Sequence, residues 1–202
     1  MQLNAPNFES PWLMARSVGT PEMPFDEAFM DLLRRSGAEE AMWKWLPRIS
    51  AGGTSFESYC KRVKVLTADQ KIYPMICNRK SDNGFVGGAT FVNHSRTHRM
   101  VQIGLVWLSE ERRDWVHFLA LQELMIRRAY NWGATRVVWH VVPQNEKMAL
   151  AIEQMGVTNE GLLRSVYRMN DGSWSDMAVY SLVQDEIPQA LDRLSETLEE
   201  HF

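Results

Sequence analysis

The side chains of this 202-residue chain that could do chemistry are few, and several familiar catalytic motifs are absent. The sequence has no G-x-S-x-G, H-E-x-x-H, C-x-x-C or P-loop pattern, so the hydrolytic, redox and phosphoryl-transfer chemistries of those motifs have no support. Its two cysteines, Cys60 and Cys77, have no histidine at ligand spacing, which argues against a zinc site. The glycine-rich run Gly84–Gly88 favours a turn and a strand bulge over a phosphate loop.

Two features remain as candidates. His140 lies in the apolar run Arg136–Val142, and the ordinary histidine pKa of about 6.5 suits a general base. A hydrogen-bonded strand histidine facing the sheet is the alternative. The pair Arg112–Arg113 stands at a helix start, where basic side chains oppose the helix dipole and a nearby anion would be favourable. An ordinary solvated helix start is the alternative there.

Composition narrows the class of protein. There are 22 Lys and Arg against 25 Asp and Glu, which gives a net charge of −3 and argues against a nucleic-acid partner. Hydrophobic residues at 45% and charged residues at 23% exclude wholesale disorder. No secretory leader and no apolar run of about eighteen residues occurs, so we expect no membrane contact. With only two cysteines, a cytoplasmic location is expected.

Periodicity and turn signals predict the elements that must position these side chains. Met1–Ser10 is expected to be loose, and Pro74 is expected to place its strand at a sheet edge or bulge. The predicted helices are 24–37, 38–46, one capped by Ser55, 110–132, 145–155 and 186–200, the last as a surface appendage, with a break at Ser50–Thr54. The predicted strands are 12–18, 71–79, 84–92, 98–108, 136–142, 161–169 and 174–183. This order indicates one mixed α/β (α+β) domain over 1–202, with a core at 10–188 and a C-terminal helical extension at 189–202.

Five segments of the second half match the pattern of a known family in order and spacing. They are Gln102–Leu108 for E-I-G-(aromatic)-x-L, Ala134–Val137 for G-x-x-R-V, Asn145–Val157 for N-x-x-S and its closing glycine, Glu160–Arg164 for E-G-x-L-R, and Asp171–Glu186 for D-G-x-x-x-D-x-x-x-Y-S. Together they resemble the RimJ/RimL-like branch of the GNAT acyltransferase superfamily. Each motif is weak alone, and the resemblance covers roughly residues 70–188.

The resemblance implies a GNAT-type fold, with a splayed, mostly antiparallel central sheet flanked by helices. It implies an N-acetyltransferase that moves an acetyl group from acetyl-CoA to a primary amine, leaving CoA and using no metal. An amine acceptor is the implied partner, either a protein N-terminus or a small molecule, and a homodimer is allowed. In the family the fourth core strand bulges away from the fifth, here 102–108 and 136–142, and exposes backbone groups to the pantetheine arm. The amides of the following helix start receive the pyrophosphate.

The implied site residues follow from that correspondence. Gln102 and His140 are the candidate catalytic residues. The candidate cofactor-binding residues are Trp107, Leu108, Arg112, Arg113, Asp114, Trp115, Val116, His117 and Asn145.

Two departures from the family pattern affect this expectation. Trp115 and His117 stand where the phosphate loop usually has glycine or alanine, although Arg112 and Arg113 could bind phosphate directly. Gln102 replaces a glutamate that can act as a base, and an amide cannot take up a proton at physiological pH. The sequence therefore favours direct attack by an already neutral amine without a protein base, with Gln102 orienting the amine or its water.

Two further alternatives stay open. Aromatic residues on the early helices either wall an apolar acceptor pocket or serve only as core; they are Trp43, Trp45, Phe56 and Tyr59. The alternative to an enzyme is a non-catalytic GNAT-fold module that binds CoA or another protein, with a degraded pyrophosphate loop.

Overall fold

The computed structural model describes residues 7–48 and 55–202, so the break expected at Ser50–Thr54 lies outside the described residues. The strands are β1 (Asn7–Glu9), β2 (Leu13–Ser17), β3 (Tyr73–Arg79), β4 (Phe85–Ser95), β5 (Met100–Leu108), β6 (Arg136–Val141), β7 (Thr158–Arg168) and β8 (Trp174–Val183). The helices are α1 (Glu27–Arg35), α2 (Ala38–Met42), α3 (Phe56–Ala68), α4 (Trp115–Asn131), α5 (Glu146–Glu153) and α6 (Glu186–Glu199), with short 3-10 helices η1 (Trp43–Trp45) and η2 (Glu110–Arg112). None of the helices in these ranges is long and apolar enough to span a membrane.

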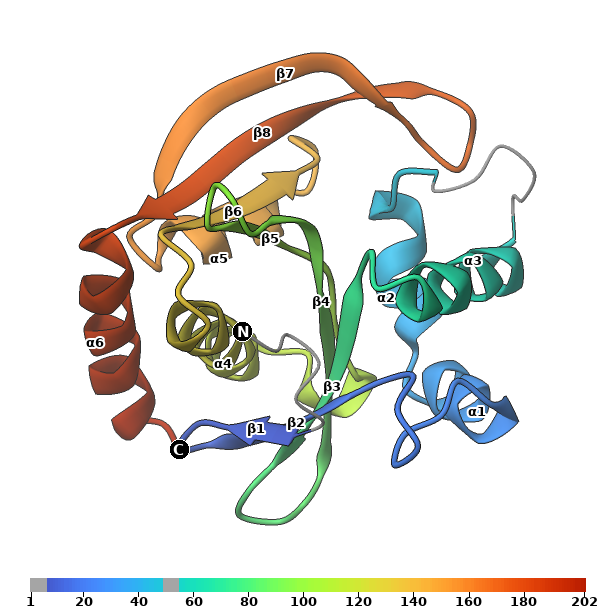
Figure 1. Ribbon diagram of the computed structural model, residues 1–202, viewed down its shortest axis with the longest axis horizontal. Helices are drawn as coiled ribbons and strands as arrows, with labels where there is room; N and C mark the ends of the chain where they lie inside the picture. The colour runs from blue at the N-terminus through green and yellow to red at the C-terminus, as the bar shows by residue number, and fades with distance from the viewer. Residues whose placement is uncertain (1–6, 49–54) are drawn as a thin grey trace.

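The strands form one sheet in the order β1-β2-β3-β4-β5-β6-β8-β7, in which only the β5–β6 pair is parallel. Helices α1, α2 and α3 cover one face of the sheet, and α4 and α6 cover the other (Figure 1). Each face has its own buried apolar cluster, the larger one under α4 and α6. The predicted mixed α/β fold with a mostly antiparallel sheet is confirmed.

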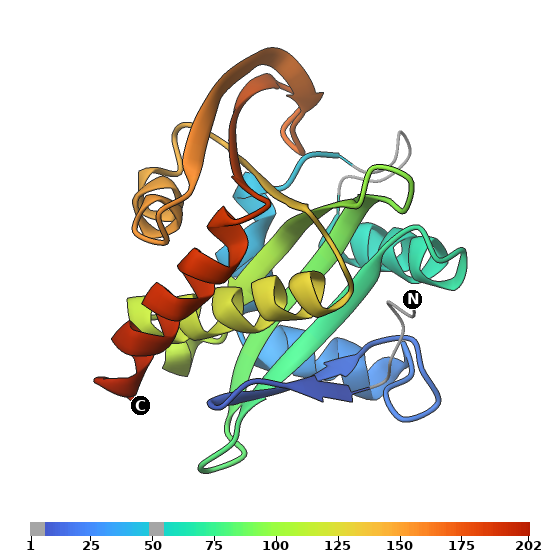
Figure 2. The same cartoon turned by 60° about the vertical axis from the view of Figure 1, so that its left-hand side comes forward.

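The structure corrects four details of the expected elements. Residues 7–9, expected to be loose, form strand β1 and pair with β2. Helix α4 begins at Trp115 and not at residue 110, because the Asp114 side chain caps it and residues 110–112 form η2. Helix α6 is no surface appendage: it packs along α4 (Figure 2), and its apolar face belongs to the main core.

The fourth correction concerns Pro74, for which an edge or a bulge was expected. Strand β3 lies between β2 and β4, so it is no edge, and its register shift against β4 is at Cys77/Asn78 and not at Pro74. The Pro74 carbonyl accepts a hydrogen bond of 2.9 Å from Val18 N. The nitrogen and carbonyl of one strand residue point to the same side, so the Pro74 nitrogen faces the β2 side. The β2–β3 pairing ends one residue earlier, at Ser17↔Met75, so the bond that the missing N–H would have made to Val18 falls at the end of the ladder and not within it.

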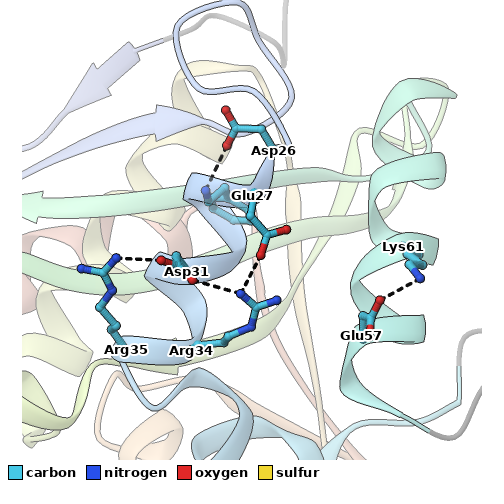
Figure 3. Close-up of polar contacts among 8 residues, drawn as sticks. Asp26, Glu27, Asp31, Arg34, Arg35, Glu57 and Lys61 are labelled. Carbon is cyan, nitrogen blue, oxygen red and sulfur yellow. Dashed lines mark hydrogen bonds and ion pairs between the residues drawn. The ribbon is translucent and has the colours of Figure 1, made fainter.

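Helix α1 begins at Glu27, after the cap residue Asp26, and helices α1 and α3 both carry ion pairs on their surfaces (Figure 3). Asp26 accepts from the amide of Phe29 at 3.0 Å, and Arg34 and Arg35 pair with Asp31 at 3.0 and 2.7 Å. These ion pairs are exposed and contribute little to stability. Burial of the opposite face of α1 against the second cluster is therefore what holds this helix to the sheet; it comprises Phe29 and Leu33.

Strand β4 approaches its neighbours closely at two glycines. A Cβ at Gly87 would lie 2.2 Å from the carbonyl oxygen of Trp107, and one at Gly88 would lie 2.6 Å from that of Met75. Gly87 also has a φ of +152°, which L side chains rarely adopt. The run Gly84–Gly88, for which a turn and a strand bulge were expected, thus leads into a strand whose glycines allow tight packing against β5 and β3.

We expect Gly87→Ala to lower the free energy of unfolding by about 3–5 kcal/mol, since it combines backbone strain with a clash against Trp107. Gly161→Ala is the matched control, because Gly161 has a φ of +129° but nothing within 4 Å of an added Cβ. That variant should lose only about 1–2 kcal/mol. Urea denaturation of the two variants measures the difference, and equal losses would contradict the steric argument.

Candidate functional site

Strands β5 and β6 part soon after they begin. Their parallel pairing runs from Met100↔Arg136 only to Gln102↔Val138. Beyond that point β6 continues to pair with β8 through Val141, while β5 continues with β4 through Leu108. The sheet therefore has a V-shaped opening between the carboxyl-terminal parts of these two strands, as the splayed fold predicts.

A β-bulge in β5 accompanies the parting. Leu105 and Val106 lie between the pairs Gly104↔Thr90 and Trp107↔Gly88, opposite the single residue Ala89 of β4. Leu105 has a φ of +50°, an uncommon conformation for a branched side chain. A bulge bends its strand and increases the local twist, so it turns the end of β5 away from β6.

A cavity of about 650 Å³ occupies this opening. It is lined by β5 from Gln102 to Leu108 and by β6 and its end from Trp139 to Val142. It also contacts the start of α4 and residues of α2 and α3. Helix α4 covers one face of the sheet, and α2 and α3 cover the other (Figure 1). The cavity therefore passes through the sheet and joins its two sides.

Gln102 lies in the lining with 9% of its surface exposed. Its side-chain oxygen accepts a hydrogen bond of 2.7 Å from the Asn93 amide on β4, and Asn93 also lines the cavity. Asn93 has a φ of +46°, which asparagine tolerates better than most residues. The amide plane of Gln102 is thus fixed by a neighbour that the sequence gave no reason to select.

His140 also lines the cavity, so it does not face only the sheet. Burial lowers its pKa below the ordinary value of 6.5, which keeps the ring neutral at pH 7. The Tyr167 hydroxyl from β7 lies 3.4 Å from His140 Nδ1 and belongs to the same lining. The site therefore contains a neutral imidazole next to a phenol that no sequence motif singled out, because Tyr167 comes from β7 and is 27 positions from His140.

The start of α4 separates the residues that were expected to act together on a phosphate. Arg113 and Asp114 line the cavity, as does Trp115, which is half exposed. Arg112 is not in the lining and pairs with Asp82 at 2.9 Å. Val116 packs against the main core and is also outside the lining.

Asp114 and His117 form a local pair at this helix start. The Asp114 carboxylate accepts from the His117 amide at 2.9 Å and contacts His117 Nδ1 at 2.8 Å. The Asp114 amide donates to Arg112 O at 2.9 Å. The first amides of a helix lack intrahelical partners, so those of Trp115 and Val116 are the ones that remain for an anion.

The other expected cofactor residues lie on the two arms of the opening. Trp107 and Leu108 are buried and line the cavity from β5. Asn145 lines it from the start of α5 and makes no side-chain capping bond within the described chain. The side-chain amide of Asn145 is therefore free to face the cavity.

One of the four early aromatic residues reaches the site. Trp45 lines the cavity, whereas Trp43 packs edge-on against Phe56 and Tyr59, each with ring centroids 6.0 Å away. Those three rings pack in the second apolar cluster, so for them the alternative of a purely structural role holds. Cys60 and Cys77 are buried on α3 and β3 outside the lining, and burial raises the pKa of both thiols.

The segment that carries Trp45 is fastened to the β7–β8 turn. Arg48 N donates to Arg168 O at 2.8 Å, and Pro47 forms an isolated bridge with Met169. The Asn170 side-chain amide donates to the carbonyls of Trp43 and Leu46 at 3.1 and 3.0 Å. This wall of the cavity is thus held by residues from the far end of the sequence.

Comparison with known proteins gives a result for structure only, since no family model and no curated protein matches the sequence. RimJ of Mycobacterium smegmatis, in complex with CoA-disulfide, is 21% identical, with a TM-score of 0.75 over 98% of this chain and 97% of that one. A GCN5-related N-acetyltransferase of Brucella melitensis is 16% identical, with a TM-score of 0.73 over 95% and 85%. The spermidine N-acetyltransferase of Vibrio cholerae, in complex with CoA and spermine, is 15% identical, with a TM-score of 0.65 over 87% and 98%.

These structural neighbours, which include RimJ, are acetyltransferases, and their fold includes nearly all of this chain. The V-shaped opening, the bulged β5 and the helix that follows it are features that the sequence resemblance implied. The chain therefore has the GNAT acetyltransferase fold.

Proposed function

We propose that this protein is an acetyl-CoA-dependent N-acetyltransferase that moves an acetyl group to a primary amine by direct attack. The observation that carries the proposal is the continuous cavity through the β5–β6 opening. Direct transfer needs donor and acceptor in one space at bonding distance, and a passage that joins both faces of the sheet provides it. Two structural neighbours were solved with CoA species bound, which supports the same use of the fold.

The residues on the α4 side of the cavity suit the donor. Beyond Gln102 the edge of β5 that faces β6 is unpaired, so its backbone N–H and C=O groups can bind the amide groups of a pantetheine arm. Asn145 offers a side-chain amide from the opposite arm. Arg113, with the amide of Trp115, would hold the pyrophosphate. When bound, acetyl-CoA supplies an acetyl group already activated as a thioester.

The residues at the centre of the cavity suit the acceptor amine. Gln102, held by Asn93, orients the amine through its own amide group. His140 is neutral and takes the proton that the attacking nitrogen loses, and the Tyr167 hydroxyl beside Nδ1 orients the ring. This assignment replaces the base-free mechanism favoured from sequence, because His140 lies in the cavity. Cys60 and Cys77 are outside it, so no acetyl-cysteine step is proposed.

We expect CoA to bind, and we expect Arg113→Gln to weaken binding about 10- to 150-fold, since hydrogen bonds to charged groups are worth about 1.5–3 kcal/mol. Arg112→Gln is the matched control, because Arg112 pairs with Asp82 away from the cavity, and it should change the dissociation constant by less than about threefold. Isothermal titration measures both. No heat from the unaltered protein at millimolar CoA would instead favour the non-catalytic interaction module.

Asp114→Asn should tighten CoA binding. Asparagine caps a helix as well as aspartate does, so α4 keeps its start, while a negative charge beside the phosphate position is lost. A carboxylate beside a phosphate in a partly solvated site costs about 1 kcal/mol of binding free energy. Its removal should therefore raise the affinity for CoA about fivefold, by less when salt is added. Weaker binding, at any salt concentration, would show that Asp114 contributes to binding the ligand.

His140→Gln should lower kcat by about 10²–10⁴-fold, the range for the loss of a general base. A protonated ring cannot accept the proton, so with His140 present the rate should fall as the pH drops through the pKa of His140, which lies below 6.5. This part of the pH–rate profile should be absent in the variant. His98→Gln, which alters an exposed turn residue, is the control. A variant rate that survives and keeps rising toward the pKa of the amine would restore the base-free mechanism.

A further inference from the structure

Taking the proposed transferase function as its basis, we propose that the acceptor is a monoamine on an apolar body, and not a polyamine. The two sides of the cavity differ in chemistry. On the side of α2 and α3 the described lining is apolar except for Arg48. Its apolar residues are Ala41, Met42, Trp45, Leu46, Pro47, Val63, Leu66 and Ile72. Filling such a surface with an apolar group is favourable, and filling it with a charged chain is not.

The charges of the described lining agree with this division. Its permanent cations are Arg48, Arg113 and Lys147, and its one carboxylate is Asp114. Asp114 caps the start of α4 and is already bonded to His117. A second ammonium group on the α2–α3 side would meet Arg48 and no carboxylate within the lining. An unpaired buried charge is costly, so this side selects against polycations.

Carboxylates outside the lining do not change the result. Asp171, whose pKa is lowered chiefly by hydrogen bonds from Ser173 and only weakly by Arg48, is exposed and bonded to the Ser173 amide and hydroxyl. Glu39 and Glu40 of α2 are exposed and lie outside the lining. The charges next to this end of the cavity are therefore positive: Arg48 belongs to the described lining, and the Lys44 ammonium lies 4.5 Å from the centroid of the Trp45 ring.

The first test compares kcat/KM for 2-phenylethylamine with that for 1,4-diaminobutane and spermidine, using acetyl-CoA as donor. We expect kcat/KM to favour the aromatic monoamine by about 100-fold. The gain from filling the apolar surface and the cost of an unpaired second charge in the diamine both act in this direction. A preference for either polyamine would overturn the inference and leave the transferase function intact.

The second test moves a carboxylate into the acceptor side. Leu66→Glu should lower the preference for the monoamine at least about tenfold, because the new carboxylate can pair with the second ammonium group of a diamine. Leu66→Gln controls for polarity and should weaken the monoamine without improving the diamine. Val65→Glu places the same charge on α3 at a residue that is 47% exposed and outside the lining, so it should leave the preference unchanged.

The two proposals fail in different ways. If CoA binds but no amine is acetylated, the transferase function is wrong. The inference is then judged by equilibrium binding of the same amines, followed through tryptophan fluorescence, since Trp45 is part of the lining. Tighter binding of the diamine than of phenylethylamine would overturn it there as well. Circular dichroism shows whether each variant is folded before either comparison is made.

Discussion

The parting of β5 from β6 after Gln102↔Val138 is the constraint on which the rest of the site depends. A ladder continued along both strands would satisfy their backbone groups and close the sheet. The bulge at Leu105 and Val106 prevents this by turning the end of β5 aside. The sheet survives the interruption because β8 pairs with the other edge of β6 along its full length. One edge of each strand is thus kept for structure, and the other is available to a ligand.

The start of α4 shows how a helix terminus can be stabilised without glycine. In the family pattern, small residues let phosphate approach the backbone. Here the Asp114 carboxylate occupies the His117 amide, and the His117 ring packs under it with 8% of its surface exposed. The terminus is therefore stable without a ligand, and any anion that binds must do so beside a carboxylate. Arg113, at the cavity, is the residue whose charge can offset this repulsion.

Much of the fold could be predicted from the sequence, because apolar periodicity and turn residues act locally. The alternation around Val101–Trp107 and the cap at Ser55 are examples of such signals. The site was harder, because neighbours in sequence need not share surroundings. Arg112 and Arg113 are adjacent, yet one pairs with Asp82 and the other lines the cavity.

The orientation of His140 depended on the β5–β6 opening, since both faces of its strand are apolar. Tyr167 was missed because it comes from the hairpin and not from the helix after β6. In the same way, the amphipathic pattern of α6 was equally consistent with a surface helix, and only its packing along α4 shows that its apolar face is core. Each of these features depends on contacts between segments far apart in sequence, on which local periodicity gives no information.

The fastening of the Trp43–Arg48 segment to the β7–β8 turn has a consequence for how the protein folds. The bonds from Asn170 to Trp43 and Leu46 join residues 127 and 124 positions apart, so the chain must close a very long loop to form them. Such contacts form late in folding, after local helices and neighbouring strands. On the ribosome, the segment that bears Trp45 emerges long before the turn that holds it. The apolar side of the cavity is therefore completed among the last parts of the molecule, and until then its surface is open to solvent and to other chains.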